Sequence, residues 1–163
     1  MDYEGFAGRE RPALLAFAWS LTGDRAAAED LAQDALEKAW RHWDRVGGYD
    51  RPGGWARRVV ANQAIDRGRR RDREHRALQR LDGMPGGEVA DIELESTDAG
   101  FWAAVRTLPA RQAQVVALHY LEDRSVADIA TVLEISEGAV KTHLHRGRLA
   151  LARTLGLTEE APR

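Results

Sequence analysis

The stretch SVADIATVLEISEGAVKTHLHRGRLALARTL, from Ser125 to Leu155, determines the fold of the C-terminal part of the chain. Ser125 is placed to cap a short helix, and Ser136 is placed to cap a longer one after a turn at Glu134 and Ile135. The first helix has apolar residues at helical spacing, at Val126, Ile129, Ala130 and Leu133. The longer helix has its own apolar side, made of Val140, Leu144, Gly147 and Leu151. Two amphipathic helices joined by a tight turn are typical of a helix-turn-helix.

The second helix of this motif also has a polar side, which presents Lys141, Thr142, His145 and Arg148. A helix-turn-helix places its second helix in the major groove of DNA, where lysine donates to guanine and threonine contacts bases by its hydroxyl or methyl group. Arg146 on the same helix suits a phosphate contact. We therefore predict DNA binding; the alternative is an ordinary helical hairpin with a solvated basic face. His143 and His145 are not expected to share a metal, because their i, i+2 spacing points them to different faces.

The N-terminal part is also predicted to be helical. A first helix has its apolar face at Leu14, Phe17, Ala18 and Leu21. It is expected to end at Gly23, where Asp24 starts the next helix. That second helix shows the same spacing at Leu36, Ala39, Trp40 and Trp43. Glycines and a proline between 47 and 54 indicate a loop, and a third helix is expected from about Trp55 into a run of arginines. No strand-like alternation persists, so the predicted fold class is all-α.

Charge is unevenly distributed along this chain of 163 residues, whose formal net charge is only −2. Residues 51–76 hold nine arginines and three acids, which gives +6, whereas residues 82–98 hold six acids and no base, which gives −6. The acidic segment also contains Pro85 and three glycines, which is typical of a flexible linker. We expect two small helical domains, at 1–76 and 99–158, joined by this acidic linker at 77–98. The +6 block indicates a polyanionic partner.

Composition narrows the classes of function. The sequence contains no cysteine, which excludes disulfides, cysteine-ligated zinc and a cysteine nucleophile. No apolar run approaches the roughly 20 residues of a membrane helix, and residues 1–11 lack the hydrophobic core of an export signal. We therefore expect a cytoplasmic protein without membrane insertion. The sequence shows no glycine-rich phosphate loop, nucleophile elbow or metal-ligand cluster, so neither catalysis nor a cofactor is expected.

Three segments resemble, in order, the functional regions of bacterial sigma factors. AEDLAQDALEKAW, Ala28 to Trp40, resembles the segment that binds core RNA polymerase. GGWARRVVANQAIDRGRRR, Gly53 to Arg71, resembles the segment that melts and reads the promoter −10 element. EGAVKTHLHRGR, Glu137 to Arg148, resembles the −35 recognition helix, and Leu108-Pro109 matches the start of the same region. Because the resemblance covers nearly the whole chain but lacks the family's third region, the chain resembles the extracytoplasmic-function (ECF) group of the sigma-70 family.

This resemblance implies a function in promoter-specific transcription initiation. The implied partners are core RNA polymerase, through its β′ clamp helices and β flap, and promoter DNA, with an anti-sigma protein as a further partner. The residues that the resemblance assigns to core polymerase are Asp30, Leu31, Gln33, Asp34 and Leu36. Those assigned to −10 DNA are Arg58, Asn62, Asp66, Arg69 and Arg70, and those assigned to −35 DNA are Ser136, Lys141, Thr142, His145, Arg146 and Arg148.

The residues themselves leave simpler roles open. The amide of Asn62 offers a donor and an acceptor to an unstacked base, but asparagine often bonds local backbone instead. Trp55 fits a core position as well as a base-stacking platform. The arginines at 67–71 suit phosphates or a solvated helix end. Asp30 and Asp34 show no obvious internal partner, which also describes any solvated helix face.

Two rival functions fit parts of the sequence: a stand-alone regulator that uses only the helix-turn-helix, and an interaction protein that binds a partner's helices without DNA. Two accounts of control also remain open. An anti-sigma protein can hold both domains, or the −6 linker can fold back on the +6 block. The second account predicts inhibition that weakens with salt.

Overall fold

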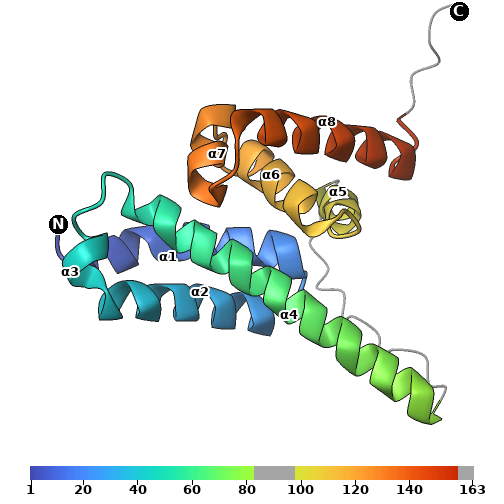
Figure 1. Cartoon of the computed structure of the whole chain (residues 1–163), viewed down its shortest axis with the longest axis horizontal. Helices are drawn as coiled ribbons and strands as arrows, with labels where there is room; N and C mark the ends of the chain where they lie inside the picture. The colour runs from blue at the N-terminus through green and yellow to red at the C-terminus, as the bar shows by residue number, and fades with distance from the viewer. Residues whose placement is uncertain (83–97, 158–163) are drawn as a thin grey trace, which may run out of the picture.

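The structure, a computed structural model, describes residues 1–82 and 98–157, and the side chains of all of these except residues 81 and 82. The described residues form helices without strands, which confirms the predicted all-α class. They make two units that lie against each other (Figure 1). Residues 83–97 of the predicted linker at 77–98 lie outside the described residues.

The N-terminal unit contains α1 (Tyr3–Thr22), α2 (Arg25–Arg41), α3 (Trp43–Val46) and α4 (Pro52–Asp82). The turn between α1 and α2 follows the prediction. Gly23 ends α1 in the left-handed conformation, with φ of 64°, and the Asp24 carboxylate accepts bonds from the backbone N–H groups of Ala26 and Ala27. Buried side chains such as Phe17, Leu31 and Val60 hold α1, α2 and α4 together.

The predicted apolar face of the second helix is wrong at Trp40. Trp40 is 62% exposed, whereas Ala35, Leu36 and Ala39 are buried. A residue advances about 100° around a helix, so Trp40 points past the edge of the stripe that packs against α1. Trp43 does pack inward, as the first residue of the separate helix α3, with its ring 5.0 Å from that of Phe6.

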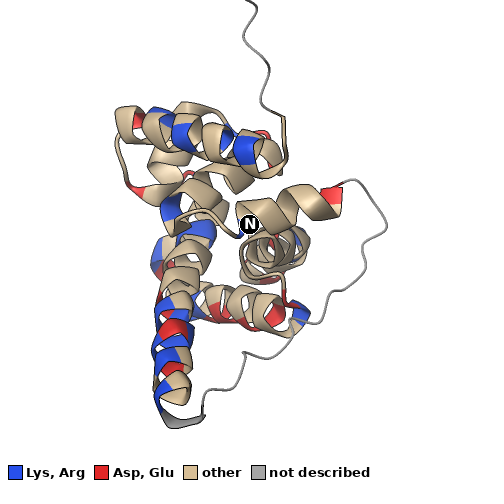
Figure 2. Cartoon of the chain, turned by 90° about the vertical axis from the view of Figure 1, so that its right-hand side faces the viewer, with Lys and Arg blue, Asp and Glu red and all other residues tan. Residues whose placement is uncertain are grey.

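Helix α4 is longer at both ends than the sequence indicated. It begins at Pro52 rather than near Trp55, since proline suits the first helical position. Gly53 and Gly54 belong to the helix, although such glycines usually indicate a loop. At the other end the helix continues to Asp82, past the expected start of the linker at 77. Its distal part projects from the body of the molecule and carries many arginines (Figures 1 and 2).

The C-terminal unit contains α5 (Asp98–Val105), α6 (Ala110–Tyr120), α7 (Val126–Leu133) and α8 (Glu137–Thr154). The predicted helix-turn-helix is confirmed. Ser125 and Ser136 cap α7 and α8 with their side chains, and Glu134 makes the turn in the left-handed conformation, with φ of 55°. The residues that α8 buries are those predicted: Val140, Leu144, Gly147 and Leu151.

The two units contact each other through α4 and α7, and through α1 with α5 and α6. At the second of these contacts the guanidinium of Arg106 lies 5.2 Å from the ring centre of Trp19, a cation–π geometry. None of the described helices is both long and apolar enough to cross a membrane.

Close packing of α8 on α6 requires glycine at position 147. A Cβ at this position would lie 2.9 Å from Cγ2 of Val116, which is shorter than a normal contact. We predict that Gly147→Ala lowers the free energy of unfolding by about 1–3 kcal/mol, the usual cost of overpacking. Gly138→Ala on the same helix is the control, because its Cβ meets no atom closer than 3.9 Å. It should raise helix stability by up to about 1 kcal/mol. Urea denaturation followed by circular dichroism compares them, and equal stability of the two variants would contradict this packing.

Candidate nucleic-acid interface

The exposed side of α8 presents the predicted base-reading residues together. Lys141, Thr142 and His145 are exposed and lie within one turn of each other, and Arg146 is exposed beside them. Ser136 lies at the start of the helix, where its hydroxyl accepts a bond of 3.0 Å from the N–H of Ala139. This row of donors, held at a capped helix start, has the form that major-groove recognition requires.

Arg148 lies apart from that row, although the sequence grouped it there. Its Nε donates a 2.7 Å bond to the hydroxyl of Tyr120 on α6, and its guanidinium lies 5.6 Å from the centre of the same ring. The side chain is therefore directed toward α6 rather than away from the motif.

The predicted −10 residues of α4 fall into two groups. Asp66, Arg69 and Arg70 are exposed on the distal part of the helix and share a shallow hollow. Asn62 and Arg58 lie nearer the body and contact the C-terminal unit. The Oδ1 atom of Asn62 accepts a 3.3 Å bond from Arg111 of α6, and Arg58 pairs with Glu134 at the end of α7.

A buried ion-pair network lies between the two units, centred on Arg57 of α4, which is only 5% exposed. Its Nε donates to both carboxylate oxygens of Glu122, at 2.8 and 2.6 Å. Its Nη1 donates to Glu10 of α1 at 2.8 Å and to the carbonyl of Gly53 at 2.9 Å. Glu122 also accepts from Arg124 at 2.6 Å. We call this set of Arg57, Glu10, Glu122 and Arg124 the central network.

Electrostatics of the contact follow from these partners. Burial by itself lowers the pKa of the Arg57 guanidinium, but the hydrogen bonds and charges of Glu122 and Glu10 outweigh it, so the pKa is raised. Arg57 therefore keeps its charge although it is desolvated. At the edge of the contact, a hydrogen bond from Arg51 lowers the pKa of Asp128. Asp128 is thus held as a carboxylate that pairs across the two units.

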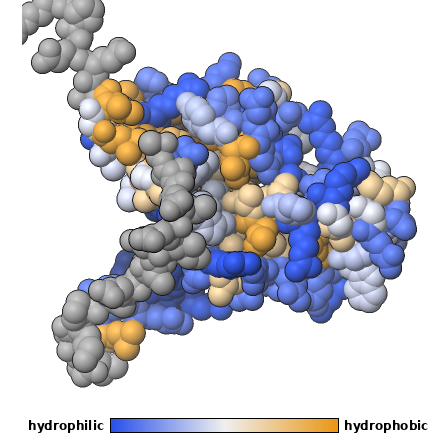
Figure 3. Space-filling model, turned by 180° about the vertical axis from the view of Figure 1, so that it is seen from behind, coloured by the Kyte–Doolittle hydropathy of each residue, from blue (hydrophilic) through white to orange (hydrophobic). Residues whose placement is uncertain are grey.

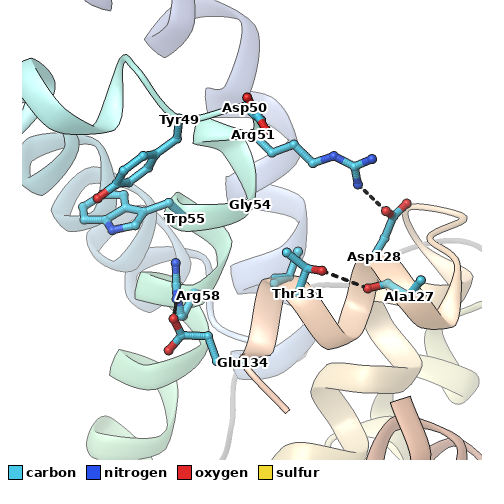
Figure 4. A pocket seen from close by; sticks show the side chains of 11 residues that line it. Tyr49, Asp50, Arg51, Gly54, Trp55, Arg58, Ala127, Asp128, Thr131 and Glu134 are labelled. Carbon is cyan, nitrogen blue, oxygen red and sulfur yellow. Dashed lines mark hydrogen bonds and ion pairs between the residues drawn. The ribbon is translucent and has the colours of Figure 1, made fainter. Parts of the chain in front are cut away.

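A cleft of about 710 Å³ opens beside this contact, between the start of α4 and helix α7 (Figure 4). Tyr49 and Trp55 line the side that the N-terminal unit forms. The ion pairs Arg51–Asp128 and Arg58–Glu134 connect this side to the C-terminal unit. Trp55 is half-buried in this wall. Tyr49 and Trp55 therefore border the same cleft as residues of α7.

The surface of α2 presents the exposed members of the predicted polymerase-binding set: Asp30, Gln33 and Asp34. Leu31 and Leu36, 3% and 6% exposed, lie in the core instead and support the helix. Asp30 has an internal partner that the sequence did not reveal, because Arg67 of α4 lies 3.3 Å from its carboxylate. Gln33 and Leu36 border a hollow between α1 and α2 that also exposes Trp40.

Comparison with known proteins places both units in one family. The Sigma-70 region 2 family matches residues 6–74, and the Sigma-70 region 4 family matches residues 100–151. The ECF RNA polymerase sigma factor SigL of Mycobacterium tuberculosis is 37% identical over 143 residues, which cover 85% of this chain and 80% of SigL. The chain belongs to the ECF sigma factors. The similarity extends to SigW of Bacillus subtilis, which is 30% identical over 84% of this chain and 80% of SigW.

The family resemblance extends to a solved structure. The sigma factor RpoE of Bartonella quintana, determined in complex with the anti-sigma factor NepR, superimposes with a TM-score of 0.76 and 29% identity. The superposition covers 97% of this chain and 99% of RpoE, and so includes both units. This sigma factor therefore directs promoter-specific transcription initiation and has the two-unit fold of its family.

Sequence reasoning missed the central network of the sigma factor. Arg57 was counted in the +6 block as a group for a polyanion, but it is buried and paired. One local signal was present: Gly53 precedes Arg57 by one helical turn, and a Cβ there would lie 2.9 Å from Arg57 Nη1 and Glu10. Glu122 lies 65 positions away in sequence, so no local pattern connects it to Arg57.

The Ser136 cap fixes the start of the helix that bears Lys141. We predict that Ser136→Ala destabilises the C-terminal unit of the sigma factor by about 1 kcal/mol, because the N–H of Ala139 loses its acceptor. Ser136→Asp should restore most of this stability, since aspartate also caps helices. Thermal unfolding measures both. Equal losses in the two variants would mean that the hydroxyl acts in some way other than as a cap.

Proposed function

We propose that this sigma factor reads the −35 element with α8 and the −10 element with α4, while α2 holds core RNA polymerase. The observation that carries the proposal is the exposed row of Lys141, Thr142 and His145 at the capped start of α8. In a helix-turn-helix such a row faces the base edges of the major groove. Arg146 and Ser136 flank the row and are assigned to phosphates, which position the helix without reading sequence.

The −10 element is assigned to α4. The arginines at 69 and 70 suit the phosphates of a displaced strand, because they are exposed and lie on the projecting part of the helix. Asn62 is assigned to an unstacked base, whose Watson–Crick edge needs both a donor and an acceptor. Asp66 lies one turn beyond Asn62 and adds acceptors for exocyclic amines.

Two surfaces are assigned to polymerase. The acids of α2 suit basic groups on the clamp helices of β′, and the hollow beside Trp40 offers apolar area next to them. The β flap is assigned to the end of α8, where apolar groups gather near the C-terminus (Figure 3). Leu149 and Leu157 are exposed there, at 47% and 66%. This chain supplies no catalysis in the proposal, and it acts in the cytoplasm, where polymerase transcribes.

An anti-sigma protein is the proposed external partner, because the similar RpoE was determined in complex with one. The stand-alone regulator is less well supported, because the N-terminal unit also matches its own sigma region. Transcription of random promoter DNA by core polymerase with this chain, followed by sequencing of the transcripts, tests the proposal. The expected result is a set of starts that share −35 and −10 elements, and a regulator would give no starts that depend on it.

The α2 surface gives a test of polymerase binding. We predict that Asp30→Lys combined with Asp34→Lys weakens binding to core polymerase at least tenfold, because two acids at the contact become bases. The control is Asp72→Lys with Glu74→Lys, two exposed acids on the projecting end of α4. Pull-down with core in the absence of DNA compares the pairs, and circular dichroism checks helical content. Equal binding by the two double variants would refute the α2 assignment.

The α8 surface gives a test of base reading. We predict that Lys141→Ala costs about 1–3 kcal/mol at the preferred −35 sequence and relaxes the base choice at one position. Arg146→Ala should instead weaken binding to all sequences alike and reduce the salt dependence. Fluorescence anisotropy with the preferred duplex and single-base variants measures both. A uniform loss for Lys141→Ala would reassign that lysine to the phosphates.

A further inference from the structure

The contact between the two units covers part of the face of α4 that the proposed function assigns to −10 DNA. Arg111 of α6 donates to both the Oδ1 atom of Asn62, at 3.3 Å, and the side chain of Gln114, at 2.8 Å. Gln114 is 1% exposed and donates a 2.9 Å bond to the carbonyl of Ala61. Asn62 is itself exposed, but a base that used its Oδ1 atom would compete with the Arg111 side chain for this acceptor.

The other predicted −10 residue near the body, Arg58, is also engaged by the C-terminal unit, as is the neighbouring Arg51. Glu134 at the end of α7 pairs with Arg58, and Asp128 of α7 pairs with Arg51. The residues of α7 also form the wall opposite Trp55. The C-terminal unit thus presents acidic groups to the basic start of α4, where a nucleic acid would otherwise place its phosphates.

We propose that this closed arrangement is an autoinhibited state, in which the helix-turn-helix unit engages the part of the −10 face around Arg58 and Asn62, and that the Arg57–Glu122 pair holds it closed. The inference rests on the proposed −10 role of Asn62. It adds a third account of control to those drawn from the sequence. Masking comes from the folded C-terminal unit itself, whereas masking by the acidic segment 82–98 would rest on residues of which 83–97 lie outside the described ones.

Arg57–Glu122 is the pair that decides the equilibrium because it is the buried one. The side chains of Arg57 and Glu122 are 6% and 11% exposed, whereas the other two pairs each have one side chain that is more than half exposed, Arg51 at 62% and Glu134 at 69%. Exposed pairs contribute little and are screened by salt. The buried pair contributes charge-assisted hydrogen bonds, from Nε of Arg57 to both oxygens of Glu122, that water cannot replace while the interface stays closed.

The same network makes opening possible. When the units part, Arg57 keeps Glu10 and the carbonyl of Gly53 as partners within its own unit. Glu122 keeps Arg124 within the other unit. Separation therefore leaves no charge without a partner. An unpaired charge is the usual penalty for breaking a buried ion pair. Two packed states with satisfied charges in each are what a switch requires.

A disulfide across the contact tests whether the closed state is inactive. A Cβ at Gly54 would lie 3.4 Å from Cγ2 of Val132, and Gly54 needs no left-handed backbone. Cysteines at both positions can therefore reach the Cβ separation of about 3.5–4.5 Å that a disulfide needs. The sequence contains no cysteine, so Gly54→Cys with Val132→Cys introduces the only two thiols. Thiol titration reports the extent of locking, and the parent chain controls for the reductant.

Two DNA probes separate the two faces of the molecule. One is a single strand that carries the −10 sequence of a promoter found from the transcripts, and the other is its −35 duplex. The oxidised double variant should bind the −10 strand at least tenfold more weakly than the reduced form. It should bind the −35 duplex equally in both forms, because Lys141, Thr142 and His145 remain exposed in the closed arrangement.

A second variant tests whether the closed state is the resting state. Glu122→Gln removes the negative charge that bridges the units, and we expect it to bind the −10 strand at least fivefold more tightly than the parent chain. Asp123→Asn is the matched control, since it changes net charge equally at the next, exposed residue. Asparagine also tolerates the φ of 52° at this position. The control should bind as the parent chain does.

The outcomes distinguish the two levels of the proposal. Equal binding of the −10 strand by the oxidised and reduced forms would overturn the autoinhibited state. Equal binding by Glu122→Gln and Asp123→Asn would overturn the role of the Arg57–Glu122 pair as its lock. If the reduced double variant and Glu122→Gln both fail to bind the −10 strand, or if they bind it and added Asn62→Ala leaves that binding unchanged, the −10 assignment of Asn62 itself fails, and the inference with it.

Discussion

A guanidinium removed from water determines how the two halves of this sigma factor meet. Arg57 is held at the contact by carboxylates from both units, Glu10 and Glu122. A buried charge is tolerated only when it is paired and hydrogen-bonded, so the position of Arg57 constrains α1, α4 and the loop after α6 together. The start of α4 obeys the same constraint, because glycine at position 53 leaves room for Arg57 and Glu10 to approach. The contacts that Asn62 and Arg58 make with the C-terminal unit follow from that placement of α4.

Local features of the fold could be predicted from the sequence, since their causes are local. The helix-turn-helix follows from two serine caps and an apolar spacing, and the turn after α1 follows from Gly23 and Asp24. The start of α4 could not, because Gly53 serves a tertiary contact while its residue type indicates a loop. The exposure of Trp40 depends on which residues of α2 pack against α1, and helical spacing alone does not define that set.

The candidate site shows the same division. The row on α8 could be predicted because Lys141, Thr142 and His145 share a face of a single helix. The state of the α4 face could not, because Asn62 meets Arg111 from a helix 49 positions away. A charge count treats all arginines of the +6 block alike, yet Arg57 is buried and paired with carboxylates while Arg69 and Arg70 are exposed. Burial, which is a tertiary property, therefore divides the block into a structural part and an exposed part.

The covalent connection between the units explains why so few contacts suffice to close the molecule. Modules joined by a short linker meet at an effective concentration on the order of millimolar. A closed state is then populated once the contact is worth more than about 4 kcal/mol, the free energy of a millimolar dissociation constant. The buried Arg57–Glu122 pair and the Gln114–Ala61 bond, with more exposed pairs around them, are of the right size for this. A contact only slightly stronger than this threshold yields readily to polymerase, because polymerase engages both units at once and gains from the same connection.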